Sequence, residues 1–144
     1  MVRAARQVRI GLLVLLVPTA VTGLHALLAP RSWYDDFTGG IAPPAAFGAY
    51  NEHFVQDLGG GYLGVAAAVL WALFHLRADV VRCALAAFLV FNVPHLAIHL
   101  AVRGDLDDTG YLFVNAGLGV SVLVACWLWF AAGRLGTGGF TGRG

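Results

Sequence analysis

The chain of 144 residues contains no lysine and few charged residues of any kind. Charged side chains make up 12% of the sequence and hydrophobic side chains 59%, whereas an average soluble domain is about 25% charged and about 45–50% apolar. This balance excludes a water-soluble enzyme and is typical of a chain that is solvated by lipid. The nine arginines and eight acids form no clustered basic face, so nucleic acid is not expected as a partner.

Cysteine is equally scarce, with only Cys83 and Cys126 in the sequence. Two cysteines exclude a disulfide scaffold. There is no Cys-x-x-Cys-His string, so any haem would have to be bound non-covalently. Ser32 and Ser121 have no matching histidine–acid pair, and the sequence therefore assigns no catalytic residue.

What the chain does contain is apolar sequence in long runs. A helix needs about 20 mostly apolar residues to cross a bilayer, and four windows reach that length, at about 8–29, 54–76, 80–102 and 110–132. Because Pro43-Pro44 suits a first helical turn, the second helix is expected to begin ahead of its window, at about 46. We therefore predict an all-α fold, a four-transmembrane-helix bundle in one integral membrane domain over 1–144, with an outer loop at 30–45 and a disordered tail at 134–144.

Arginine sets the predicted orientation of this bundle. Seven of the nine arginines fall on the side that holds both termini, and only Arg31 and Arg103 fall on the other side. Cytoplasmic loops carry the excess of arginine in membrane proteins. We therefore predict a multi-pass protein of the plasma membrane with both termini in the cytoplasm. Within the outer loop, Ser32-x-x-Asp35 predicts a capping box for a short interfacial helix.

Small residues recur at a spacing of four in two of the predicted helices. The second helix has Gly60, Gly64, Ala68 and Ala72, and the fourth has Gly117, Ser121 and Ala125. Such stripes allow close helix contacts in membranes, and we expect them to face other helices of the same chain. A homo-oligomer or a membrane protein partner remains the alternative. In the third helix, Pro94 predicts a kink, because it lacks an N–H and clashes with the preceding turn.

Polar residues from all four helices converge on the predicted outer half. His53 with Asp57, and His95 with His99, each lie four residues apart on one helical face. These four could supply three nitrogens and one oxygen to zinc, copper or iron. The expected supporting residues of this pocket are His25, Glu52, Asn92 and Asn115. His25 and His95 could alternatively hold a non-covalent haem from opposing helices.

Other interpretations of the same residues stay open at this point. Histidine and asparagine also hydrogen-bond across membrane helices as purely structural links. The chain could then be a non-catalytic membrane subunit or scaffold that associates through its Gly/Ala faces. A third hypothesis is a quinone-linked redox subunit. An ionisable cluster inside a membrane favours a functional role by default.

Three stretches carry a resemblance to known sequences, namely PRSWYDDFTG at 30–39, YNEHFVQDLGGGYLG at 50–64 and VPHLAIHL at 93–100. They resemble uncharacterised four-span membrane proteins of actinobacteria. In size and layout the chain is also similar to DoxX-like four-helix membrane proteins, some of which are linked to quinone reduction. The resemblance implies a plasma-membrane four-helix protein with no assigned activity.

Overall fold

A computed structural model of the protein describes residues 2–135, and within this range it is helical with no strand. Four of its helices are long and apolar enough to cross a membrane. They are α1 (Val2–Leu28), α3 (Glu52–Phe74), α4 (Ala78–Ala101) and α5 (Asp108–Ala132). Three shorter elements join α1 to α3, namely α2 (Pro30–Asp36) and the 3-10 helices η1 (Phe37–Gly40) and η2 (Pro44–Phe47). The prediction of four long apolar helices is thus confirmed.

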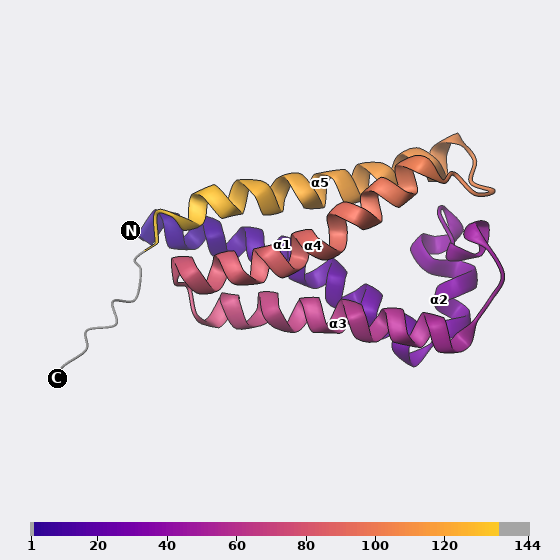
Figure 1. Cartoon of the computed structure of the whole chain (residues 1–144), viewed down its shortest axis with the longest axis horizontal. Coiled ribbons are helices and arrows are strands. Elements are labelled where there is room, and N and C mark those ends of the chain that lie inside the picture. The colour runs from indigo at the N-terminus through magenta and orange to yellow at the C-terminus, as the bar shows by residue number, and fades with distance from the viewer. Residues whose placement is uncertain (1, 136–144) are drawn as a thin grey trace.

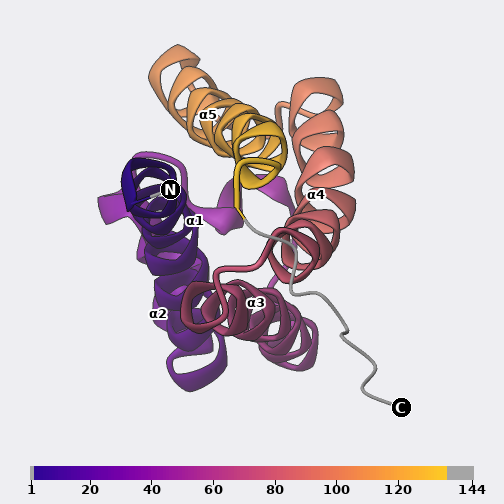
Figure 2. The same cartoon turned by 90° about the vertical axis from the view of Figure 1, so that its left-hand side faces the viewer.

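The four long helices form a ring in which α1 and α4 each pack against both α3 and α5 (Figure 2). Figure 1 shows α2 and its neighbouring turns at one end of this ring and the amino terminus at the other. We call the first the loop end, made of residues 29–51 and 102–107, and the second the terminal end. The long helices carry many exposed apolar side chains, including Leu28, Phe74 and Phe130, as a lipid-facing surface requires.

The main hydrophobic core lies in the terminal half of the bundle. Each long helix contributes fully buried side chains to it, among them Leu12, Val69, Leu85 and Leu128. The loop half has only a small cluster of Ala26, Trp33 and Val55. The four helices are therefore tightly packed at one end, while the other end has space between them.

The helices separate toward the loop end (Figure 1). There α4 changes direction part of the way along its length, as expected from Pro94 within it. Helix α1 also contains a proline, Pro18, and the hydroxyl of the next residue, Thr19, donates to Leu15 O at 2.7 Å. Prolines in the middle of two helices thus accompany the opening of the bundle.

Close packing between α1 and α3 depends on Gly23 and Gly59. A Cβ on Gly59 would lie 2.7 Å from Leu27 N and 2.9 Å from Gly23 O, closer than side chains tolerate. The predicted stripe is only partly correct, because Gly60 and Gly64 are exposed and have nothing near them, while Ala72 is buried. Likewise Gly117 has open space around it, and Ala125 is buried. The closest contact with α1 is therefore made by Gly59, one residue before the predicted Gly60.

The first long helix begins at Val2, not at about 8, and three further details of the predicted elements are wrong. The second long helix begins at Glu52, not at about 46, because η2 stops at Gly48 (φ 149°) and Asn51 Oδ1 then accepts from Phe54 N at 3.1 Å as the helix cap. Helix α2 begins at Pro30 with no side-chain cap, so Ser32 lies inside it and forms no capping box. In the tail, Leu135 is buried in the core; the rest of the predicted disordered segment, 136–144, lies outside the described residues.

Candidate functional site

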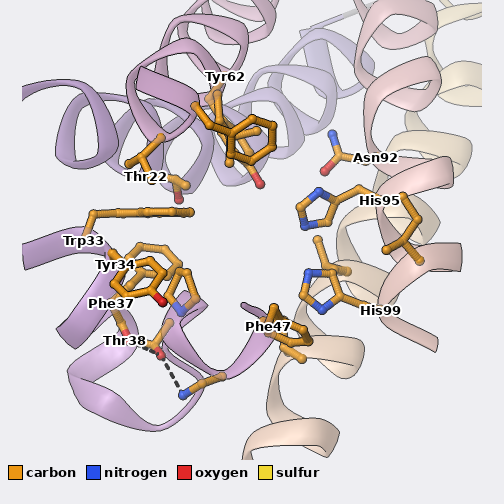
Figure 3. Close-up of a pocket in the computed structure, with 18 of the residues that line it drawn as sticks. Thr22, Trp33, Tyr34, Phe37, Thr38, Phe47, Tyr62, Asn92, His95 and His99 are labelled. Atoms are coloured by element: carbon orange, nitrogen blue, oxygen red, sulfur yellow. Dashed lines mark hydrogen bonds between the residues drawn. The ribbon is translucent and has the colours of Figure 1, made fainter. Parts of the chain in front are cut away.

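A cavity of about 510 Å³ occupies the loop half, where the helices separate. All four long helices line it, together with α2 and the two 3-10 turns. Aromatic side chains form part of its walls, and none of the lining residues is aspartate, glutamate, lysine or arginine. Figure 3 shows these side chains projecting into a common space from opposite sides. The cavity is thus an uncharged, mostly apolar compartment with a few polar groups, as small-molecule sites commonly are.

Helix α4 supplies most of the polar wall. Asn92, His95 and His99 line the cavity from one face of this helix, at the spacing of i, i+3 and i+7. The imidazole ring centroids of His95 and His99 are 4.7 Å apart. Asn92 is 4% exposed and donates from Nδ2 to Phe88 O at 2.9 Å, and Figure 3 shows its oxygen on the side of His95. The prediction that these three residues share one stripe is confirmed.

Trp33 of α2 forms the facing wall (Figure 3). Its backbone N–H donates to Ala29 O at 2.9 Å, and its ring packs in a cluster with Ala26 and Val55 and lies 5.6 Å from that of Phe37. The side chain is only 7% exposed, and its indole Nε1 has no hydrogen-bond partner among the described residues. Trp33 thus lines the cavity and carries a buried indole N–H that no described residue satisfies.

His99 carries a second unpaired buried atom on the opposite wall. Its Nδ1 has no hydrogen-bond partner within residues 2–135. Phe47 of η2 meets the His99 ring edge-on, with centroids 4.7 Å apart and an interplanar angle of 87°. Tyr62 of α3 contacts the same wall, with its ring 4.8 Å from Phe91 and 6.2 Å from His95. Buried polar atoms are nearly always paired in folded proteins. Among the described residues the unpaired buried side-chain atoms are Trp33 Nε1, His99 Nδ1 and Asn115 Oδ1, and the first two belong to residues that line the cavity.

The remaining predicted site residues lie away from the cavity. His53 Nε2 and Asp57 Oδ2 are 3.4 Å apart, but their side chains are 87% and 68% exposed on the surface of α3. Glu52 is exposed beside them. His25 contacts Ser32 Oγ through Nε2 at 3.2 Å, and none of these residues lines the cavity. Helix α3 therefore turns its predicted metal ligands away from those of α4.

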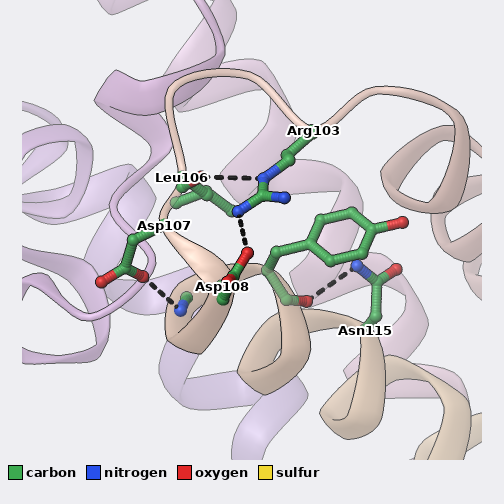
Figure 4. A network of polar contacts seen from close by, with 7 residues as sticks. Arg103, Leu106, Asp107, Asp108 and Asn115 are labelled. Carbon is green, nitrogen blue, oxygen red and sulfur yellow. Dashed lines mark hydrogen bonds and ion pairs between the residues drawn. The ribbon is translucent and has the colours of Figure 1, made fainter.

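Asn115 belongs to a different network, which holds the connection between α4 and α5 (Figure 4). Its Nδ2 donates to Tyr111 O at 2.8 Å. In the same region Arg103 donates from Nε to Leu106 O at 3.0 Å and pairs with Asp108, and Asp107 caps α5 by accepting from Gly110 N at 2.7 Å. This network fixes one side of the loop end and does not contribute Asn115 to the cavity.

The predicted set of four metal ligands is thus not brought together. Residues 2–135 contain no group of three or more histidine, cysteine, aspartate or glutamate side chains placed to hold a metal ion. Of the four predicted ligands, only His95 and His99 lie together in the cavity. Two ligands are too few for a typical zinc site, which has at least three protein ligands. The arrangement fits a small uncharged molecule better than a metal ion.

Electrostatic interactions stabilise the rim of the cavity next to Tyr34. Asp35 accepts from Arg31 Nε at 2.6 Å, and this hydrogen bond and charge raise the pKa of Arg31. The Arg31 guanidinium also lies 4.9 Å from the centre of the Tyr50 ring. The pKa of Tyr50 is raised above its usual value. The larger cause is the removal of solvent from its hydroxyl group, and a smaller cause is the negative charge of Glu52. Tyr34 in turn donates its hydroxyl hydrogen to Gly48 O, which joins α2 to the turn before α3.

Sequence reasoning missed Trp33, Phe47 and Tyr62 as cavity residues. From its position in the loop after the first helix, Trp33 is expected at the membrane interface. It faces the cavity because α2 packs across the loop end of the bundle. The comparisons do not add a functional assignment, because no family model, curated protein or solved structure matches the chain.

Proposed function

We propose that the protein is a multi-pass protein of the plasma membrane with both termini in the cytoplasm and the loop end outside. The distribution of arginine supports this orientation. Arg3, Arg6, Arg9, Arg77, Arg82 and Arg134 belong to the terminal end, against Arg31 and Arg103 at the loop end. The cavity then lies in the outer half of the membrane, just beneath the outer surface.

In this setting the cavity binds a small, uncharged, lipophilic molecule that accepts hydrogen bonds. The observation that carries this proposal is the unpaired indole N–H of Trp33, which is buried and lines the cavity. A buried donor without a partner costs about 1–3 kcal/mol, and an acceptor on a ligand would remove that cost. Because no lining residue is aspartate, glutamate, lysine or arginine, an uncharged ligand suits this cavity better than a charged headgroup.

Within this proposal, the positions of Trp33 and His99 favour a quinone as the ligand. Trp33 and His99 line the cavity from facing walls, and each has an unpaired buried nitrogen atom; a quinone carries carbonyl oxygens on opposite edges of a flat ring. His99 Nδ1 can donate in one of its two neutral tautomers. The aromatic side chains of Tyr34, Phe37 and Phe47 supply apolar surfaces for such a ring.

The test measures binding of menadione, a small naphthoquinone, to the protein in lipid nanodiscs, together with mass spectrometry of lipophilic molecules that copurify. We expect saturable binding to the wild type. Trp33→Phe keeps the ring and loses the donor, which should weaken binding about two- to tenfold. Trp71→Phe is the matched control, because Trp71 lies exposed on α3 and stacks on His75.

Two results would overturn the proposal. One is a wild-type protein that neither binds menadione nor copurifies with any lipophilic molecule. The other is equal binding by wild type, Trp33→Phe and Trp71→Phe, since the donor would then play no part.

A further inference from the structure

We infer that residues 38–48 form a lid over the cavity, that Phe47 is the side chain that closes it, and that molecules reach the cavity from the loop end by displacing this lid. The identity of the molecule rests on the proposed function. The movement of the lid does not, because it can be measured without any ligand.

Both ends of the lid contain residues with positive φ. Thr38, Gly39 and Gly40 have φ values of 62°, 66° and 77°, and Gly48 has a φ of 149°. Glycine adopts such conformations with little cost and has many alternatives close in energy, whereas a positive φ is strained for the β-branched Thr38. Between these two points Ala42 is the only fully buried residue, and residues 43–47 are half-buried. A segment with few fully buried side chains opens at a lower free-energy cost than the packed helices around it.

The lid is held by α2, through η2 and the hydrogen bond from the Tyr34 hydroxyl to Gly48 O, and by the loop between α4 and α5. Asp105 N donates to Ala46 O at 2.9 Å, and a Cβ added to Gly104 would meet the Phe47 ring at 3.0 Å. At the start of α5, Gly110 lies so close to the Ile41 carbonyl that a side chain there would collide with it. Glycines at these two positions therefore allow the lid to close.

Phe47 connects the lid to the polar wall. Its ring lines the cavity and meets the His99 imidazole edge-on at 4.7 Å, and Figure 3 shows it next to His99 on the side away from Asn92. Trp33, by contrast, is fixed within its own buried cluster. Trp33 thus belongs to a packed wall of the cavity, whereas the aromatic side chain beside His99 is carried by a segment that lies between the long helices.

The experiment measures how fast a charged, water-soluble methanethiosulfonate reagent modifies a single cysteine inside the cavity. Thr22→Cys places that cysteine on the cavity wall, in a background with Cys83→Ser and Cys126→Ser. Phe47→Ala removes the closing side chain. Gly110→Ala pushes on the Ile41 carbonyl without altering a cavity residue. Gly117→Ala is the matched control on the same helix, because nothing lies within 4 Å of its added Cβ.

We expect Phe47→Ala and Gly110→Ala each to raise the modification rate about fivefold or more, and Gly117→Ala to leave it unchanged. Unchanged rates in Phe47→Ala or in Gly110→Ala would overturn the lid. An equal increase in Gly117→Ala would do so too, because it would reflect general loosening of α5. Failure of menadione to bind would count against the proposed function alone, since these rates are measured without it.

Discussion

Gly23 of α1 and Gly59 of α3 bring two helix backbones into direct contact. A Cβ on Gly23 would lie 3.0 Å from Gly59 O, and one on Gly59 would lie 2.9 Å from Gly23 O. Apolar side chains gain little by leaving lipid for another apolar surface, so close contacts of this kind contribute much of the association between membrane helices. This contact also fixes the helices that carry Thr22 and Tyr62 into the cavity.

Gly59→Ala should therefore destabilise the protein by about 1–3 kcal/mol through overpacking. The matched variant is Gly60→Ala, one residue along the same helix, where an added Cβ has nothing within 4 Å. We expect this control to be neutral or slightly stabilising, because alanine favours helix over glycine by about 1 kcal/mol. Thermal unfolding in detergent measures both, and equal melting temperatures would contradict the assigned contact.

The cap of α5 provides a second test of the loop end. Asp107 Oδ1 accepts from Gly110 N at 2.7 Å, and removal of such a cap costs about 0.5–2 kcal/mol. Asp107→Ala should lower thermal stability by that amount. Asp105→Ala, in the same loop, removes a carboxylate while keeping the backbone bond from Asp105 N to Ala46 O. A loss of stability in Asp105→Ala as large as that in Asp107→Ala would show that charge, not capping, is responsible.

The proposed orientation predicts which ends of the bundle can be labelled from outside the cell. In a background with Cys83→Ser and Cys126→Ser, Asp36→Cys at the end of α2 should react with a membrane-impermeant maleimide in intact cells. Arg77→Cys, between α3 and α4, should react only after permeabilisation. Both positions are exposed in the structure, so accessibility alone does not separate them. The opposite pattern would place the termini outside.

We expect the stability of the folded protein to depend on pH through Tyr50, which lies at the rim of the cavity. Its pKa is raised by loss of solvent and by Glu52, so the folded protein favours the neutral phenol. The associated stabilisation is fully present below the ordinary tyrosine pKa of about 10 and is lost as the pH rises through the higher pKa of the folded state. Subtracting the phenolate absorbance titration of Tyr50→Phe from that of the wild type isolates this group. Glu52→Gln should move its pKa back toward the ordinary value, and an unchanged titration would exclude the role of Glu52.

The long helices could be predicted from sequence because each is an apolar run that exceeds the thickness of a bilayer. Their boundaries were harder where short polar side chains decide them. Asn51 caps α3 and Gly48 ends the preceding turn. In the sequence, however, Pro43-Pro44 is the more prominent signal for the start of a helix. The run of three glycines at 59–61 presents a similar ambiguity, because the rotation of α3 determines whether Gly59 or Gly60 faces α1.

The candidate site was predictable on one helix and not between helices. Asn92, His95 and His99 share a face through their spacing alone. The position of His53 and Asp57 depends instead on how α3 is rotated against its neighbours, and this is set by the Gly23–Gly59 contact. Trp33 reaches the cavity because α2 folds back over the bundle. Such long-range placement has no signature in the local sequence.

The separation of the four helices toward the loop end gives the molecule a wedge-like outline in the view of Figure 1. If the bundle lies upright, it occupies more area in one leaflet than in the other. We therefore expect lateral pressure and membrane curvature to act on the two halves unequally: compression of the wider leaflet would squeeze the cavity, whereas stretching would enlarge it. The lipid composition around the protein would then influence the volume available to a bound molecule without any contact with it.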